Sequence, residues 1–158
     1  MAEPLSLPPV PEPPKGERLK NTVVLLTGAA QGIGEAIVAT FASQQARLII
    51  SDIQGEKVEK VAAGWRDKGF DVQAIKADVS RQQDLHAMAR LAIERHGRID
   101  VLVNCAGVNV FRDPLEMTEE DWHRCFAIDL DGAWYGCKAV LPQMIEQGIG
   151  SIINIAST

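Results

Sequence analysis

The sequence predicts an α/β fold in which a central parallel sheet is covered by helices on both faces. From Asn21 onward, short apolar runs rich in β-branched residues alternate with longer segments of helical periodicity, the pattern of repeated β-α-β units. Two of the runs, 23–26 and 101–103, are continuously apolar rather than alternating. Continuous runs of this kind are expected of parallel strands buried on both faces.

Residues 1–18 precede this pattern and are predicted to form a proline-rich, disordered arm. Six of the eight prolines lie in the first fourteen residues, where their fixed φ angles and missing N–H groups disfavour helix and strand. The segment lacks the apolar core of a secretory signal, and no apolar run approaches the ~18 residues of a membrane-spanning helix. Residues 19–158 are predicted to form one domain.

Five strands and four helices are expected in alternation. The strands are 22–26, 47–51, 72–76, 99–104 and 151–155, and the helices are 32–45, 55–68, 81–96 and 118–147. The last helix has the clearest start, because Thr118 followed by Asp121 has the spacing of an N-cap pair, and acidic residues suit the positive end of a helix.

The turn after the first strand, residues 28–34, reads GAAQGIG. Glycines at such a place let the chain turn tightly and let the backbone and the helix N-terminus approach a phosphate. The spacing differs from the common dinucleotide motif G-x-G-x-x-G, and Glu35 stands where a P-loop would have lysine. By itself the cluster leaves an ordinary strand-to-helix turn as an equal alternative.

Asp52 ends the second strand eighteen residues after Gly34, the place at which an acidic side chain accepts hydrogen bonds from an adenosine ribose. Its carboxylate would repel a 2′-phosphate, and neither Gln31 nor Ile53 offers a compensating cation. NAD is therefore favoured over NADP. The alternative is that Asp52 is a helix N-cap.

Composition excludes several other functions. With 16 Lys and Arg against 21 Asp and Glu, the net charge is −5, and no basic stripe indicates a nucleic-acid or membrane partner. The three cysteines and three histidines have no metal-ligand or disulfide spacing. We expect no metal site and a cytoplasmic location.

Three further motifs stand at strand ends: Asp78-Val79, Asn104-Cys105-Ala106-Gly107 and Asn154-Ile155-Ala156-Ser157. Together with the glycine turn and Asp52, in this order, they make the sequence resemble the classical short-chain dehydrogenases/reductases. The resemblance covers 19–158, roughly the N-terminal three-fifths of a typical member, and implies that these residues form an NAD(P)-binding domain that is incomplete at its C-terminus. It implies a Rossmann-type, doubly wound parallel sheet of strand order 3-2-1-4-5, truncated before the last strands.

The resemblance also implies roles for individual residues. The cofactor-binding positions are Gly28, Gln31, Gly32, Ile33, Gly34, Asp52, Ile53, Asp78, Val79, Asn104, Ala106 and Gly107. Asp78 and Val79 would contact the adenine, and the motif at 104–107 would steady the sheet and line the nicotinamide-ribose region. Cys105 replaces a commoner asparagine, and we interpret it as a small packed residue rather than a nucleophile.

The catalytic positions implied are Ser157, whose hydroxyl would hold the substrate oxygen, and Asp129, where the family usually has asparagine in a proton relay. The family's tyrosine and lysine, spaced by four residues, would follow Ser157 by about a dozen residues, but the sequence given stops at Thr158. Tyr135 and Lys138 have the wrong spacing and precede Ser157, so we reject them as that pair.

The sequence therefore predicts an NAD-dependent oxidoreductase that interconverts a secondary alcohol and a ketone, on a sugar or sugar acid by resemblance alone. The 158-residue chain is expected to bind the dinucleotide with negligible turnover. The complete protein is expected to be a homodimer or homotetramer. A catalytically dead dinucleotide sensor or interaction module is the alternative, and a methyltransferase of similar topology is disfavoured by the motifs after the fourth and fifth strands.

Overall fold

A computed structural model describes residues 13–156 of the chain. Its strands are β1 (Val23–Thr27), β2 (Arg47–Asp52), β3 (Val72–Lys76), β4 (Val101–Asn104) and β5 (Ser151–Asn154). Its helices are α1 (Gly32–Ser43), α2 (Gly55–Arg66), α3 (Gln82–His96), α4 (Glu119–Cys125), the π-helical segment η1 (Phe126–Asp131) and α5 (Gly132–Gln147). Each predicted strand and helix is present, with boundaries that differ by a few residues.

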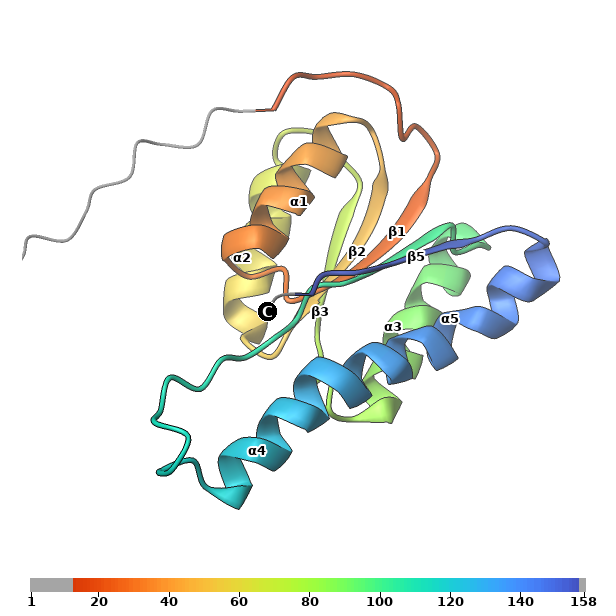
Figure 1. The fold of residues 1–158 in the computed structure, drawn as a ribbon. Coiled ribbons are helices and arrows are strands. Elements are labelled where there is room, and N and C mark those ends of the chain that lie inside the picture. The colour runs from red at the N-terminus through yellow and green to blue at the C-terminus, as the bar shows by residue number, and fades with distance from the viewer. Residues whose placement is uncertain (1–12, 157–158) are drawn as a thin grey trace, which may run out of the picture.

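The strands form one parallel sheet in the order β3-β2-β1-β4-β5, so the predicted topology is confirmed. Helices α1 and α2 lie on one face of the sheet, and α3 and α5 lie on the other (Figure 1). At the centre, Leu25 of β1 is in register with Ile49 of β2 on one side and with Leu102 of β4 on the other. Because the strands are parallel, their carboxyl ends meet at one edge of the sheet.

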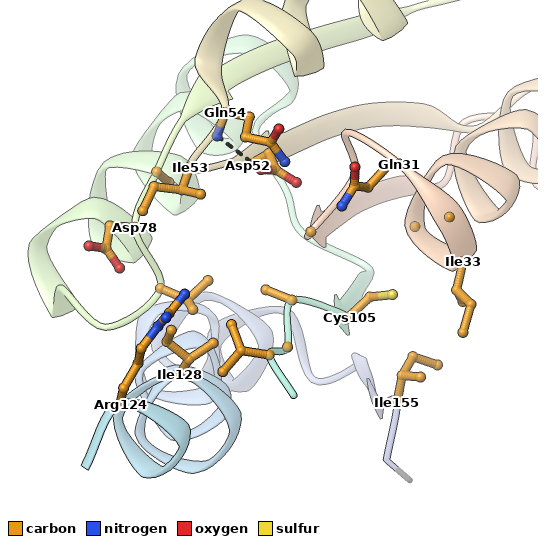
Figure 2. A pocket seen from close by; sticks show the side chains of 18 residues that line it. Gln31, Ile33, Asp52, Ile53, Gln54, Asp78, Cys105, Arg124, Ile128 and Ile155 are labelled. Atoms are coloured by element: carbon orange, nitrogen blue, oxygen red, sulfur yellow. Dashed lines mark hydrogen bonds between the residues drawn. The ribbon is translucent and has the colours of Figure 1, made fainter. Parts of the chain in front are cut away.

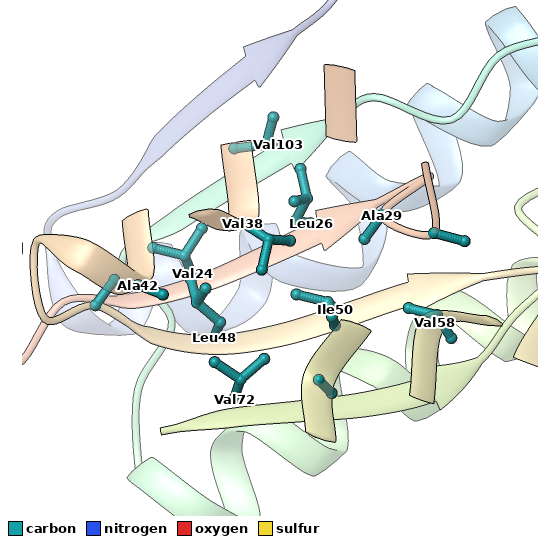
Figure 3. Close-up of a cluster of buried hydrophobic side chains, with 13 residues drawn as sticks. Val24, Leu26, Ala29, Val38, Ala42, Leu48, Ile50, Val58, Val72 and Val103 are labelled. Atoms are coloured by element: carbon teal, nitrogen blue, oxygen red, sulfur yellow. The ribbon is translucent and has the colours of Figure 1, made fainter. Parts of the chain in front are cut away.

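Two apolar cores flank the sheet, and successive residues of β1 alternate between them. One core joins strand residues to α1 and α2 (Figure 3), and its fully buried members include Val24, Leu26, Val38, Leu48, Ile50 and Val58. The other joins the opposite strand faces to α3 and α5, and includes Val23, Leu25, Ile49, Met88, Leu102 and Val140. Burial on both faces is the physical reason that β1 is continuously apolar.

The last predicted helix begins as expected but is not α-helical throughout. The Thr118 hydroxyl accepts a hydrogen bond from the Asp121 N–H at 3.1 Å, and the Asp121 carboxylate accepts one from the Thr118 N–H at 3.2 Å. This capping box confirms the predicted start. The expectation of one uniform helix over 118–147 was wrong, because the π-helical segment η1 separates α4 from α5. A π-turn inserts one residue into the helix and changes which side chains face the core after it, and a reading at a constant period of 3.6 residues does not locate that insertion.

The end of the predicted proline-rich arm contacts the C-terminal end of α1. The Gly16 N–H donates to the Ser43 carbonyl at 2.9 Å, and the Gln44 side-chain amide donates to the Pro14 carbonyl at 2.7 Å. Residues 1–12 lie outside the described part, so the disordered arm over 1–18 stays a prediction. Over 13–156, no helix combines the length and apolar character needed to cross a bilayer.

Candidate functional site

A cleft of about 560 Å³ opens at the carboxyl edge of the sheet, where open α/β sheets bind ligands. Eleven of the twelve predicted cofactor residues line it: Gly28, Gln31, Gly32, Ile33, Gly34, Asp52, Ile53, Asp78, Val79, Ala106 and Gly107. Residues that the sequence reasoning did not assign to the cofactor complete the lining: Gln54, Ala77, Cys105, Val108, Arg124, Ile128 and Ile155 (Figure 2). The volume is in the range of small-molecule sites.

The glycine turn forms one wall of the cleft, and two of its glycines leave no room for a side chain. Gly28 has a φ of +69°, and a Cβ there would lie 2.6 Å from the Ala106 Cα. A Cβ on Gly34 would lie 2.0 Å from the Gly28 carbonyl oxygen. The turn leads into α1, whose N-cap residue, Gln31, makes no side-chain cap. The N–H groups of the first helical turn are thus free of a side-chain cap at the cleft, as a pyrophosphate site requires.

Thr27 ties the glycine turn to the motif after β4. It is 1% exposed, and its hydroxyl oxygen accepts hydrogen bonds from the Cys105 N–H at 3.1 Å and the Ala106 N–H at 3.2 Å. The ends of β1 and β4 are therefore held together by one side chain. This contact positions Ala106 and Gly107 opposite the glycine turn.

Asp52 lies at the cleft and is not a helix N-cap, because Gln54 occupies that position of α2. The two carboxylate oxygens of Asp52 accept hydrogen bonds from the Ala30 N–H at 3.1 Å and the Gln54 N–H at 2.9 Å. The acid is thereby fixed between the glycine turn and the start of α2 (Figure 2). Its remaining lone pairs can accept hydrogen bonds from a ligand hydroxyl.

A cation contacts the lining of the cleft through Gln31, and reasoning from sequence neighbours did not find it. The ammonium of Lys57, in the first turn of α2, donates a hydrogen bond to the side-chain carbonyl of Gln31. The residues next to the motifs, Gln31 and Ile53, carry no positive charge, so the prediction from sequence contains no cation at this place. The signal in the sequence was a lysine five residues after Asp52, within one turn of the start of the predicted helix.

Asp78 and Val79 line another part of the cleft. The Asp78 carboxylate accepts hydrogen bonds from the Ser80 N–H at 3.0 Å and the Ser80 hydroxyl at 2.7 Å, and the Asp78 N–H donates to Asp84 at 3.0 Å. This segment is therefore ordered by its own side chains. Arg124 of α4 and Ile128 of η1 also reach this part of the lining. Sequence reasoning missed both. Arg124 lies in α4 and reaches the cleft only through tertiary packing, and Ile128 lies in the π-turn, whose phase is not readable from periodicity.

Asn104 is the predicted cofactor residue that does not line the cleft. Its side chain is 7% exposed, and its amide nitrogen donates to the Asn154 side-chain oxygen at 2.8 Å and to the Ala133 carbonyl at 3.2 Å. It therefore joins β4 to β5 and to α5 behind the cleft. This contact steadies the sheet rather than contributing surface to the ligand.

Cys105 is half-buried in the cleft wall, and burial raises the pKa of its thiol. A raised pKa disfavours the thiolate, which is the nucleophilic form. The geometry therefore agrees with a packed residue. Over residues 13–156, no group of three or more His, Cys, Asp or Glu side chains is arranged to hold a metal ion.

Of the two predicted catalytic residues, Asp129 lies in the described part of the chain and Ser157 does not. Asp129 is in η1, where its carboxylate accepts a hydrogen bond from the Val108 N–H at 2.9 Å, next to Gly107. Ser157 lies outside the described residues, two positions after Ile155, which lines the cleft. Lys138 places its ammonium 4.6 Å from the centre of the Trp134 ring, and neither it nor Tyr135 lines the cleft, in keeping with their rejection as a catalytic pair.

Comparison with known proteins agrees with this geometry. A family model described as short chain dehydrogenase matches residues 22–158. The oxidoreductase UcpA of Salmonella typhimurium is 42% identical over 140 residues, which are 89% of this chain and 53% of that protein. The D-threitol dehydrogenase of Mycolicibacterium smegmatis is 38% identical over 140 residues, covering 89% of this chain and 54% of that protein.

A solved structure is similar over the same region. The crystal structure of a short-chain dehydrogenase/reductase from Burkholderia phymatum in complex with NAD has a TM-score of 0.85 at 28% sequence identity, covering 88% of this chain and 50% of that chain. The chain thus spans about half the length of the relatives it matches. The sheet order, the cleft at its carboxyl edge and the match over 22–158 agree, and the chain belongs to the short-chain dehydrogenase family.

Proposed function

We propose that the chain forms the NAD-binding part of an oxidoreductase that interconverts a secondary alcohol and a ketone. The observation that carries the proposal is the cleft in which the tight glycine turn, the uncapped start of α1 and Asp52 come together. The turn and helix start would bind the pyrophosphate, and Asp52 would accept hydrogen bonds from the adenosine ribose. Asp78 and Val79 would contact the adenine.

When bound, the nicotinamide would exchange a hydride with the carbon that bears the substrate oxygen. Ala106 and Gly107 would line the nicotinamide-ribose region, and the Ser157 hydroxyl would donate a hydrogen bond to the substrate oxygen as negative charge develops on it. Asp129, whose carboxylate lies beside Gly107, would take part in the proton relay. The family's tyrosine and lysine pair is not among the 158 residues, so we expect this chain alone to bind without turnover.

A sugar, sugar acid or related polyol is the proposed substrate class. It is supported by the resemblance and by one relative that is named a dehydrogenase of D-threitol, a small polyol. The proposed location is the cytoplasm, which is supported by the three free cysteines.

Self-association of the complete protein is proposed through the face of α4, η1 and α5. Large apolar side chains on this face are exposed: Trp122, Phe126, Leu130, Trp134 and Ile145. An exposed patch of this kind is typical of a protein interface.

The proposal is tested by titrating the chain with NADH while following the nicotinamide fluorescence, with S-adenosylmethionine as the comparison ligand. Saturable binding of NADH and none of S-adenosylmethionine is expected. The isosteric change Asp52→Asn should weaken NADH binding about three- to tenfold, because a charged acceptor becomes neutral. Asp67→Asn, an exposed acid at the end of α2, is the control and should leave binding unchanged.

Three results would contradict parts of this proposal. A folded chain that binds no NADH would remove the dinucleotide function altogether. Binding of NADH combined with robust oxidation of D-threitol by the 158 residues alone would show that the expected lack of turnover is wrong. Binding without turnover in a complete protein that carries the tyrosine and lysine would favour the sensor alternative.

A further inference from the structure

Lys57 is joined to Gln31, a residue of the cleft lining, by a contact between two helix starts. Its ammonium, in the first turn of α2, donates a hydrogen bond to the side-chain carbonyl of Gln31, the N-cap residue of α1. Gln31 lines the cleft. A flexible lysine on an exposed helix face would otherwise sample many positions, so this bond localises a positive charge next to the ligand space.

The same end of the cleft holds the negative charge of Asp52. One Asp52 oxygen accepts from the N–H of Ala30, the residue before Gln31, and the other accepts from the N–H of Gln54, three residues before Lys57. Figure 2 shows Gln31, Asp52 and Gln54 grouped at this end of the cleft. The acid and the cation of segment 52–57 therefore each contact segment 30–31, Asp52 through Ala30 and Lys57 through Gln31.

We propose that Lys57, held by Gln31, is a specificity-determining residue of the dinucleotide site, because its ammonium attracts a 2′-phosphate and so opposes the repulsion by Asp52. The inference depends on the proposed binding of a dinucleotide with its adenosine ribose at Asp52. A 2′-phosphate placed there meets a carboxylate that repels it and an ammonium that attracts it. Neutralising the carboxylate leaves the cation already in place.

These charges predict whether each substitution raises or lowers the affinity for NADPH. With Asp52 neutral, a phosphate gains a charge-assisted partner in Lys57 and loses its repulsive neighbour. With Lys57 neutral as well, the phosphate loses that partner. NADH carries no 2′-phosphate, so its affinity depends little on Lys57. Because both groups are reached by solvent, the effects are expected to be modest and to weaken with added salt.

The experiment titrates NADH and NADPH separately into the full chain and into the variants Asp52→Asn, Lys57→Gln, the double variant, and Lys60→Gln. Lys60 is an exposed lysine one turn further along α2 and serves as the matched control. Binding is followed by nicotinamide fluorescence at low salt and again at about 0.5 M salt, where charge interactions are screened. Far-UV circular dichroism shows that each variant is folded.

Asp52→Asn should raise NADPH affinity about tenfold. Adding Lys57→Gln to this variant should lower NADPH affinity again by about five- to tenfold. The same addition should change NADH affinity less than about twofold. Lys60→Gln in the Asp52→Asn background should leave the gain intact. The inference is overturned if Asp52→Asn still binds NADH but gains no NADPH affinity, or if the gain survives Lys57→Gln. Failure of the folded wild-type chain to bind either dinucleotide overturns the proposed function itself.

Discussion

At the scale of single residues, the site depends on a few polar side chains that connect segments distant in sequence. Thr27 is buried and accepts hydrogen bonds from two backbone N–H groups that are 78 and 79 residues away. A β-branched residue at the end of an apolar strand gave no sign of this role. Asp52 and the glycines were predictable because their chemistry belongs to a local motif, whereas Thr27 and Lys57 act through partners on other elements.

Thr27→Val should destabilise the chain by about 2 kcal/mol, because two partly buried N–H groups lose their acceptor. Thr27→Ser keeps the oxygen and loses only a methyl group, so it should lower the free energy of unfolding by about 1 kcal/mol. The free energy of unfolding, measured in urea, and the affinity for NADH test this pair. Equal stability and equal affinity of the two variants would show that the hydroxyl does not hold the strand ends together.

At the scale of secondary-structure elements, periodicity predicted each helix and strand but not its detailed course. The predicted helix over 118–147 contains the π-helical segment η1, and this segment carries Ile128 and Asp129 at the site. A π-turn adds one residue to a helical turn, so side chains after it face directions that a period of 3.6 residues does not give. The start of this helix was predictable, because the capping box is local.

The start of α1 is the element on which ligand binding most depends, and Gly34→Ala tests it. The added Cβ would meet the Gly28 carbonyl oxygen at 2.0 Å, so α1 must shift away from β1. NADH affinity should fall at least about tenfold, as loss of well-placed phosphate contacts implies. Gly64→Ala lies in open space within α2 and should instead stabilise the chain by about 0.5–1 kcal/mol.

Normal NADH affinity in Gly34→Ala would show that the close approach of α1 to the glycine turn is not needed for binding. Titration and urea unfolding of both variants together separate a local loss of binding from a general loss of stability.

At the scale of the whole molecule, the double-sided packing determines stability and leaves the His96 imidazole in a poorly solvated place. The His96 side chain at the end of α3 is 6% exposed, and its Nε2 lies 4.0 Å from an Asp71 carboxylate oxygen. Desolvation lowers the pKa of His96, although Asp71 opposes this effect. The folded chain therefore takes up this proton less readily than the unfolded chain.

Stability should consequently fall as the pH is lowered. Above the ordinary pKa of 6.5, His96 is neutral in both states and the full stability is present. As the pH falls below 6.5, the unfolded chain gains a proton that the folded chain does not, and stability is lost until the folded pKa is passed. His96→Gln should flatten this part of the profile of urea midpoint against pH, while the exposed His123→Gln should not.

An unchanged slope in His96→Gln would show that other groups cause any loss of stability between pH 7 and pH 5. The comparison uses slopes rather than absolute midpoints, so a constant cost of removing the imidazole does not affect it.

The sequence by itself determined the order of strands and helices, the glycine turn and the acids at strand ends, because periodicity and turn chemistry act over a few neighbouring residues. Only the tertiary structure decided which side chains meet across the cleft. Lys57 reaches Gln31 across 26 positions, and Asn104 turns away from the cleft to bind Asn154 across 50.

The burial of the strands is likewise decided by the tertiary structure and not by the local sequence. Apolar runs predicted both β1 and β5, yet β1 is buried throughout while β5 is largely exposed, since one is central in the sheet and the other is at its edge. Contacts between distant residues and positions within a sheet follow from how the layers pack, and no local pattern encodes them.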